Sequence, residues 1–184
     1  MEQDQLRLAQ RGDDDALNEL IVTYQQPVFS LCYRMLGVRQ EAEDAAQEAI
    51  VKAVMKLHLY DADRPFKPWI LRIASNECID RIRRRKEAVS LDGMGEDGAW
   101  EWQVGNSPNP ESAYLREEEQ FLVNRILDEL SPTDRLVVTL FYWEGLAYTE
   151  ISEVTGLSVS AIKSRLFRAR RDLAEILVEE GTYA

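Results

Sequence analysis

The C-terminal stretch 144–177 contains the pattern that most restricts the fold of this chain. A short helical pattern over residues 147–154 ends at Gly156, where a glycine takes a positive φ angle at little cost. Ser158 is a suitable N-cap for a second helix. The apolar residues of that helix recur at spacings of three and four, as one buried face requires: Val159, Ile162, Leu166, Ala169, Leu173 and Ile176. Two helices joined by a short glycine turn predict a helix-turn-helix, whose second helix lies in the DNA major groove.

The polar face of the second helix favours DNA binding over simple exposure to solvent. Residues 158–171 contain five basic residues and no acidic one. Lys and Arg side chains neutralise phosphates, while Ser and Lys near the helix N-terminus reach base edges. The face consists of Ser160, Lys163, Ser164, Arg165, Arg168, Arg170 and Arg171. A solvated basic face is the alternative, but so local a positive charge is unusual in a chain of net charge −11.

The charge is unevenly distributed along the chain. Residues 64–87 carry eight basic and three acidic groups, whereas residues 1–63 carry six basic and twelve acidic ones. Residues 88–157 carry three basic and fourteen acidic groups. Two basic segments in an acidic chain indicate two contacts with nucleic acid, and the acidic surfaces indicate a different, basic partner.

The remaining pattern is helical, with no strand pattern of any strength, and predicts an all-α fold. We expect two small helical domains, at residues 1–88 and 111–184, joined by an acidic, Gly- and Pro-containing linker over residues 89–110. A helix is expected to end at Gly37, with a kink or a break at Pro27. A loop is expected over residues 60–68, with Trp69 starting the next helix.

Composition argues against an enzyme, a secreted protein and a membrane protein. His58 is the single histidine, the acids form no metal-spaced cluster, and no phosphate-binding glycine loop is visible. We therefore expect no catalytic residue, no metal and no cofactor. No apolar run approaches the roughly 20 residues of a membrane span, and the acidic N-terminus does not resemble a signal peptide, so we expect a cytoplasmic protein without membrane insertion. Cys32 and Cys78 are interpreted as buried thiols, with a disulfide or redox switch as the alternative.

Three segments carry motifs that are more specific than helical periodicity. The first is the acidic helical segment 41–48, which reads EAEDAAQE. The second runs from RPFKPWILRIASN at residues 64–76 to DRIRRR at residues 80–85. The third contains LSP at residues 130–132, GLAYTEI at residues 145–151 and IKSRLFRAR at residues 162–170. Together, in this order, they resemble the extracytoplasmic-function (ECF) sigma factors of bacterial RNA polymerase over nearly the whole chain.

The resemblance implies a role for each segment. Core polymerase would be bound, at the β′ clamp helices, by Glu43, Asp44, Gln47 and Glu48. The −10 element would be melted and read by Tyr60, Asn76, Asp80, Arg83, Arg84 and Arg85. The −35 element would be read by Tyr148, Lys163, Ser164, Arg165, Phe167, Arg168 and Arg170. The resemblance also implies contact with the polymerase β flap, promoter DNA as ligand, and control by an anti-sigma factor, often membrane-anchored.

Some positions depart from the family pattern. Ile50 and Val54 stand where an aromatic pair is common, Phe141 replaces a common Arg, and Ala147 replaces a Ser that would cap a helix. Trp69 is interpreted either as a core residue or as a base contact.

A conventional helix-turn-helix regulator, binding duplex DNA without polymerase, is the alternative function. It explains residues 111–177 equally well. It leaves the acidic segment 41–48 and the basic segment 64–86 without a role, and it requires a self-association surface that residues 172–180 do not clearly offer.

Overall fold

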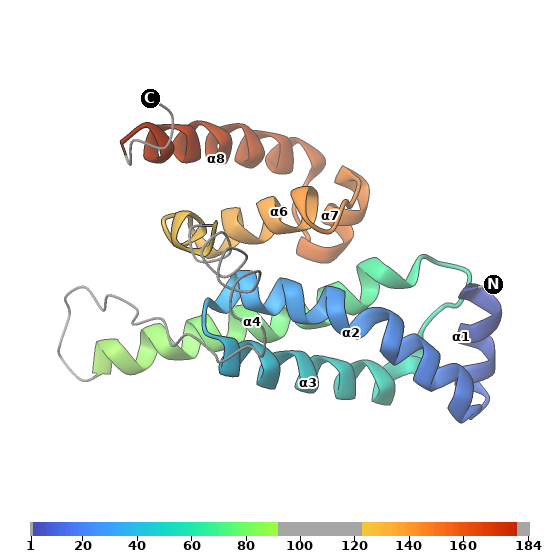
Figure 1. Cartoon of the computed structure of the whole chain (residues 1–184). Coiled ribbons are helices and arrows are strands. Elements are labelled where there is room, and N and C mark those ends of the chain that lie inside the picture. The colour runs from blue at the N-terminus through green and yellow to red at the C-terminus, as the bar shows by residue number, and fades with distance from the viewer. Residues whose placement is uncertain (1, 92–122, 180–184) are drawn as a thin grey trace, which may run out of the picture.

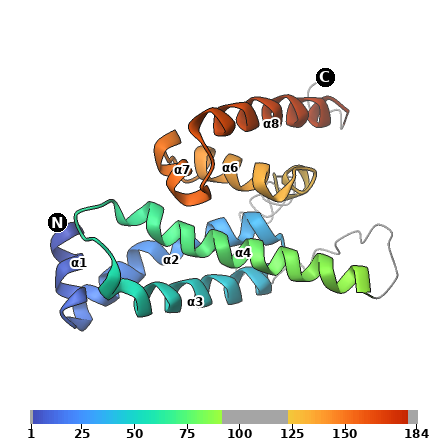
Figure 2. The same cartoon turned by 180° about the vertical axis from the view of Figure 1, so that it is seen from behind.

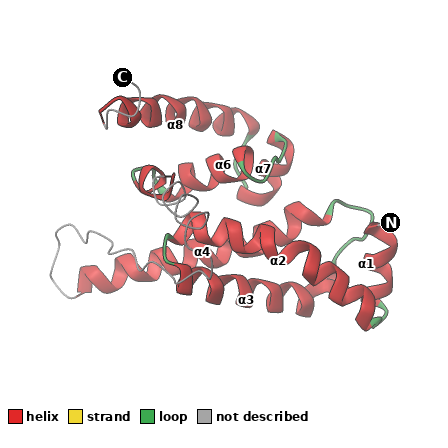
Figure 3. Cartoon of the chain, in the orientation of Figure 1, coloured by secondary structure: helices red, strands yellow, loops and turns green. Residues whose placement is uncertain are grey.

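The computed structural model describes residues 2–91 and 123–179 of the chain (Figure 1). Every regular element in these two ranges is a helix, as Figure 3 shows. The prediction of an all-α fold is therefore confirmed. Most of the predicted linker and the start of the helix predicted after it lie outside the described residues.

The N-terminal unit (residues 2–91) is a helical bundle. It contains α1 (Glu2–Gln10), α2 (Asp14–Leu36), α3 (Arg39–Lys56), the short 3₁₀ helix η1 (Leu57–Leu59) and α4 (Phe66–Leu91). Helices α2, α3 and α4 pack against one another, and α1 packs against α2 at one end of the bundle (Figures 1 and 2). Helix α4 continues past residue 88, where we expected the domain to end.

Helix α2 is continuous, so of the kink or break expected near Gln26 the break is wrong. Asp13 caps its first turn by accepting a hydrogen bond from the backbone, and Gly37 ends it in the left-handed conformation, with a φ angle of 75°. Pro27 removes a single donor, which leaves the carbonyl one turn earlier without its helical partner. Buried Tyr24 and Val28 flank the proline, and their packing in the bundle core holds this segment helical.

Helix α4 begins at Phe66 rather than at Trp69, so the predicted start was about one turn late. Pro68 caused the error, because prolines usually mark loops. It lies within the first turn of α4, where the backbone N–H has no helical acceptor and its absence costs nothing.

The C-terminal unit (residues 123–179) contains the predicted helix-turn-helix. Residues 123–128 are helical, followed by α6 (Pro132–Tyr142), α7 (Tyr148–Thr155) and α8 (Val159–Glu179). Gly156 ends α7 with a φ angle of 74°. The hydroxyl of Ser158 accepts a hydrogen bond from the backbone N–H of Ala161 at 3.2 Å, which caps α8. Ser131 caps α6 with Pro132 in its first turn.

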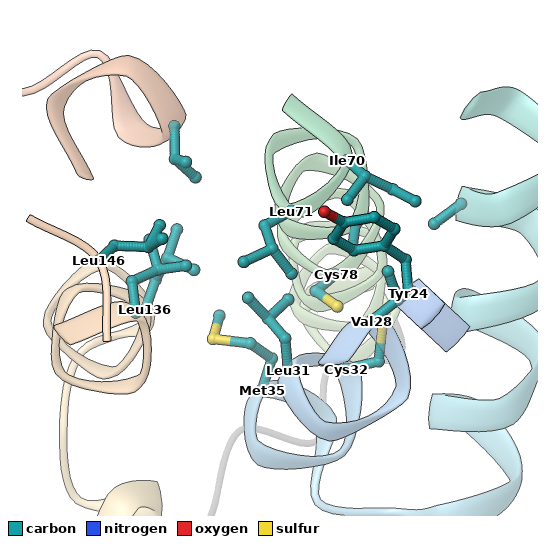
Figure 4. Packing of buried hydrophobic residues seen from close by; sticks show 14 of the residues in the cluster. Tyr24, Val28, Leu31, Cys32, Met35, Ile70, Leu71, Cys78, Leu136 and Leu146 are labelled. Atoms are coloured by element: carbon teal, nitrogen blue, oxygen red, sulfur yellow. The ribbon is translucent and has the colours of Figure 1, made fainter. Parts of the chain in front are cut away.

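One apolar cluster joins the two units. Met35, Leu31 and Leu71 of the N-terminal unit face Leu136 and Leu146 of the C-terminal unit (Figure 4). All five side chains are buried. Helix α7 packs against α4, and α6 packs against α2. In this structure the two units therefore form one closed body.

The two cysteines are free thiols in the core of the N-terminal unit. Cys32 lies on α2 and Cys78 on α4, and both are fully buried (Figure 4). A hydrogen bond with Cys32 and burial raise the pKa of the Cys78 thiol well above its ordinary value. A protonated, buried thiol is a poor nucleophile, so the interpretation of these residues as core thiols is confirmed.

A small apolar cavity of about 20 Å³ lies between α2, α3 and the start of α4. Ile50 and Val54, which stand where the family commonly has aromatic residues, contribute to its wall. The other lining residues are Leu17, Leu20, Ile21, Tyr24, Ala53, Leu57, Phe66 and Ile70.

Adding one methylene at this cavity should stabilise the fold. We expect Val54→Ile to raise the free energy of unfolding by about 0.5–1 kcal/mol, since the added group becomes buried in an existing space. Val51→Ile is the matched control, because Val51 is 56% exposed on the same helix. Urea denaturation measures both variants. An equal gain in both, or a loss in Val54→Ile, would show that the cavity does not accept the methylene.

Candidate nucleic-acid interface

The outer face of α8 is the most exposed basic surface of the C-terminal unit. Helix α8 buries Ile162, Leu166 and Ala169 against its own unit. The opposite face presents Lys163, Ser164, Phe167, Arg168 and Arg170 to solvent. Phe167 is 64% exposed, which is unusual for so large an apolar ring. This face points away from the N-terminal unit, because α6 and α7 lie between them (Figures 1 and 2).

Tyr148 is held beside the start of this face. Its ring stacks on Phe141 at a centroid distance of 5.3 Å and an interplanar angle of 3°. The ammonium group of Lys163 lies 5.3 Å from the centroid of the Tyr148 ring. Phe141 thus packs against a residue that the sequence analysis predicted to contact DNA.

Arg165 has a structural partner that the sequence did not reveal. Its guanidinium binds the carboxylate of Asp134 at 2.7 Å and so ties α8 to α6. Burial acts to raise the pKa of Asp134, but hydrogen bonds from Ser131 and Arg165 outweigh it and hold that pKa below its ordinary value. Arg165 is half-buried, whereas Arg168, three residues further along the helix, is exposed.

Tyr60 fastens the loop between η1 and α4 instead of extending into solvent. Its hydroxyl donates to the carbonyl oxygens of Arg64 and Pro65, each at 2.8 Å. The centroid of its ring lies 4.7 Å from the centroid of the Trp69 ring and 5.4 Å from that of the Phe66 ring. Burial raises the pKa of Tyr60 to about 12. Trp69 is half-buried in this aromatic cluster, so the interpretation of Trp69 as a core residue fits its position.

Of the other residues predicted to read the −10 element, Asn76, Asp80, Arg83 and Arg84 lie toward one side of α4, whereas Arg85 lies on the opposite side, toward α3. Asn76 and Asp80 are one turn apart and therefore share a helix face. Asp80 pairs with Arg83 at 3.1 Å. Arg84 is exposed, and Arg85 forms an ion pair with Glu41 of α3.

The acidic side of α3 is largely open to solvent. Asp44, Gln47 and Glu48 are exposed, and Glu43 is half-buried. Glu43 pairs with Arg39 at 2.9 Å, one turn earlier on the same helix. Glu48 lies 3.2 Å from Arg81 of α4. Helix α3 thus keeps an acidic face while two of its acids, Glu41 and Glu48, pair with arginines of α4.

Sequence reasoning missed a buried carboxylate between α3 and α4. The side chain of Glu77 is 6% exposed, pairs with Lys52, and lies 3.1 Å from Arg81. Burial acts to raise the pKa of Glu77, but hydrogen bonds from Lys52 and Arg81 hold it below the ordinary value of 4.5. The sequence did contain a signal of this ion pair. Glu77 follows apolar positions of α4 and stands four residues before Arg81, which is the spacing of neighbours on one helix face.

Two further charged residues that the sequence analysis did not single out lie at the junction of the units. Lys67 of α4 donates to the carbonyl oxygen of Glu144 at 2.7 Å and lies 3.2 Å from its carboxylate. Arg135 of α6 donates to the carbonyl oxygen of Met35 at 3.0 Å. Local sequence patterns do not reveal these contacts, because their partners are 77 and 100 residues apart in the chain.

Two searches of the described residues gave negative findings. No described helix combines the length and the apolar character that crossing a membrane requires. Among the same residues, His, Cys, Asp and Glu side chains form no group of three that is arranged to hold a metal ion.

Two family models match the chain. The model of Sigma-70 region 2 matches residues 20–88, which cover most of the N-terminal unit. The model of Sigma-70, region 4, matches residues 120–173, which include the helix-turn-helix.

Whole proteins of the same kind are similar over nearly the full length. The ECF RNA polymerase sigma factor SigW of Bacillus subtilis is 34% identical over 94% of this chain and 94% of its own length. The RNA polymerase sigma-H factor of Pseudomonas aeruginosa is 34% identical over 96% of this chain and 94% of its own length. The structure of CnrH in complex with the cytosolic domain of CnrY is 25% identical, with a TM-score of 0.73 over 97% of both chains. RpoE of Bartonella quintana, solved with the anti-sigma factor NepR, shares the fold, with 22% identity and a TM-score of 0.69 over 87% of this chain and 95% of its own.

Removing the charge of Glu77 should destabilise the protein in a pH-dependent way. Glu77→Gln leaves Lys52 and Arg81 without a buried carboxylate, so we expect a loss of about 2 kcal/mol at neutral pH. Because the folded protein lowers the pKa of Glu77 below 4.5, this stabilisation is complete above that pH and is lost as the pH falls through the folded pKa. The difference from wild type should therefore shrink in acid.

Denaturant titrations between neutral and acidic pH measure this difference. Glu87→Gln is the control, because its carboxylate is exposed on the same helix, 3.9 Å from Arg83. A pH-independent deficit in Glu77→Gln would contradict the ionic role of Glu77.

Proposed function

Because this chain belongs to the ECF sigma factors of the sigma-70 family, we propose that its two helical units divide promoter recognition between them. As a member of that family, it acts with core RNA polymerase and promoter DNA to initiate transcription. We assign polymerase binding and the −10 element to the N-terminal domain, residues 1–88. The −35 element is assigned to the C-terminal domain, residues 111–184, with residues 89–110 as the connector.

The observation that carries the proposal is the composition of the N-terminal unit. An exposed acidic face on α3 and a basic, aromatic-containing surface on α4 stand side by side in one bundle. A regulator that binds only duplex DNA has no use for this pair of surfaces. A factor that must hold a basic protein partner and open a promoter needs both.

The polymerase contact is assigned to Glu43, Asp44, Gln47 and Glu48. Asp44 and Gln47 are the most suitable, because their side chains are exposed and reach no other helix in the described contacts. Glu48 serves the contact only in part, since it also binds Arg81 of α4. Carboxylates on an exposed helix face complement a positively charged partner and exclude negatively charged ones.

The two DNA contacts differ in chemistry. Lys163, Ser164, Phe167 and Arg168 on α8 suit a major groove, because they combine hydrogen-bond donors with an exposed ring. Arg165, Arg170 and Tyr148 support that face. On the other unit, Asn76, Asp80 and Arg83 to Arg85 follow α4 from the loop that Tyr60 holds. Aromatic rings and cations together suit an unpaired strand.

The relatives also indicate how the chain is regulated. RpoE was solved with the anti-sigma factor NepR and CnrH with the cytosolic domain of CnrY, and we assign control by an anti-sigma factor to this chain. Sigma factors are non-catalytic regulators, so the proposal includes no enzyme activity, and it places the protein in the cytoplasm with the polymerase.

Reversing the charge of Asp44 should strongly reduce transcription. We expect Asp44→Arg to lower run-off transcription with bacterial core polymerase at least tenfold, because a cation replaces an acid at the centre of the proposed contact. Glu19→Arg is the control, since Glu19 is exposed on α2 away from this face. Equal activity of the two variants would exclude the α3 face as the polymerase contact.

Truncating Arg168 should weaken the −35 contact selectively. With polymerase present, we expect Arg168→Ala to reduce transcription from a matched promoter about tenfold or more, since base-edge contacts of Arg contribute about 1–3 kcal/mol. Arg171→Ala is the control, because Arg171 is exposed on the same helix and pairs with Asp172 at 3.0 Å. If both variants lose activity equally, then α8 contributes only general positive charge.

A further inference from the structure

Helix α1 contacts the loop between η1 and α4 (residues 60–65) through a row of polar side chains. Gln3, Arg7 and Gln10 follow one another at spacings of four and three, so they lie on one face of the helix. Gln3 donates to the carbonyl oxygen of Asp63 at 3.3 Å, and the guanidinium of Arg7 pairs with the carboxylate of Asp63. Figures 1 and 2 show α1 beside this loop at one end of the bundle.

Gln10 binds the backbone where η1 passes into the loop. Its side-chain amide donates to the carbonyl oxygen of Leu57 at 2.9 Å and to that of Tyr60 at 2.6 Å, and both hydrogen bonds are partly buried. The nitrogen of a side-chain amide has two donor hydrogens, and these two carbonyl groups use both. Gln10 therefore fixes the direction in which the chain leaves η1.

Tyr60 is held through its backbone as well as through its side chain. Its carbonyl oxygen accepts a hydrogen bond from Gln10, while its hydroxyl donates to the carbonyl oxygens of Arg64 and Pro65. The first of these bonds ties the start of the loop to α1, and the other two tie that start to the end of the loop. The loop is therefore closed on itself and anchored to α1 at one residue.

Helix α1 also reaches the aromatic rings beside the loop. The hydroxyl of buried Tyr24 donates a hydrogen bond to Glu2, in the first turn of α1. The Tyr24 ring lies edge-on to the Phe66 ring, with 5.0 Å between their centroids, and Phe66 lies edge-on to Tyr60, with 5.4 Å between theirs. The rings that pack against Tyr60 are thus connected to α1 as well.

The docking of α1 on the bundle does not depend on these polar contacts. Leu6 and Ala9 are buried, and α1 packs against α2, so burial of apolar surface accounts for the docking. The pair between Arg7 and Asp63 is exposed to solvent, where ion pairs contribute little to stability. The polar row therefore acts on the conformation of the loop more than on the stability of the bundle.

We propose that Gln10 and Arg7 of α1 are positioning residues for the −10 element, because they hold the loop 60–65 in the conformation that accepts an unpaired promoter base. This inference rests on the proposed function of the loop and α4. Ordering a loop during binding costs free energy, so a loop that is already fixed binds its target more tightly and more selectively. Both residues act through the loop and not by touching DNA.

Removing the donors of Gln10 should weaken discrimination between −10 sequences. Gln10→Glu keeps the size of the side chain but places a carboxylate, which has no donor, beside two carbonyl oxygens. The measurement is run-off transcription with bacterial core polymerase, from a promoter that the wild-type chain transcribes and from the same promoter with substituted −10 bases. We expect the ratio of these two rates to fall about fivefold, in keeping with the loss of two neutral hydrogen bonds.

The corresponding ratio for substituted −35 bases should stay at its wild-type value. A smaller amount of folded protein lowers all the rates together and leaves each ratio unchanged, so a selective fall in the −10 ratio reports positioning. Gln25→Glu is the matched control, because it makes the same change at an exposed position of α2 in the same unit.

The pair between Arg7 and Asp63 provides a second test at exposed positions, where a substitution leaves the core intact. Arg7→Asp and Asp63→Arg should each lower the −10 ratio about twofold, and the variant that carries both changes should recover it. A general effect of charge on DNA binding predicts opposite changes for the two single variants, because one removes positive charge and the other adds it.

The outcomes separate this inference from the proposed function. A wild-type −10 preference that persists in Gln10→Glu and in both single variants of the pair overturns the positioning role and leaves the proposed function standing. An equal fall in Gln25→Glu, or opposite effects of Arg7→Asp and Asp63→Arg, would attribute the changes to charge and overturn it as well. A wild-type chain without any preference among −10 sequences overturns both.

Discussion

The closed arrangement of the two units depends on a buried cation at their junction. The guanidinium of Arg135 on α6 donates to the carbonyl oxygen of Leu127 at 2.8 Å and of Met35 at 3.0 Å, and pairs with Asp128 at 2.7 Å. Met35 lies in the last turn of α2, where carbonyl groups lack helical partners and carry the negative end of the helix dipole. Burial lowers the pKa of Arg135, an effect that Asp128 opposes. Leu127 and Asp128 belong to the same unit as Arg135, so the Met35 carbonyl is the partner that this charge reaches across the junction.

Buried charged contacts at this junction specify one geometry more than they stabilise it. A purely apolar interface would bind more tightly, whereas buried ion pairs gain little net stability and are costly when one partner is removed. Lys67 of α4 and Glu144 form a second charged contact across the junction. Water and salt compensate such groups when the interface opens. The contact therefore specifies one closed form without making that form permanent.

Charged residues in this protein divide between internal and external roles, and residue type does not predict the division. Arg165 and Arg168 belong to one basic run, yet Arg165 holds α8 to Asp134 while Arg168 faces solvent. The carboxylate of Glu77 on α4 is buried in an ion pair, while Asp44 remains exposed on α3. Tyr60 fastens its own loop through two carbonyl oxygens. The sequence located these sets of residues but did not show which members form contacts within the fold and which remain exposed.

The sequence by itself determined the helices, their ends and the surfaces of α8 and α3. Helix caps and left-handed helix ends involve only residues close together in the chain, so a local sequence pattern predicts them. The caps here are Asp13, Ser131 and Ser158, and the left-handed ends are Gly37 and Gly156. Pro27 and Pro68 misled for the same reason, because packing and position in the helix override local preference. Only the tertiary structure decided that the two units close on each other through Arg135 and Lys67, because those contacts join segments far apart in the chain.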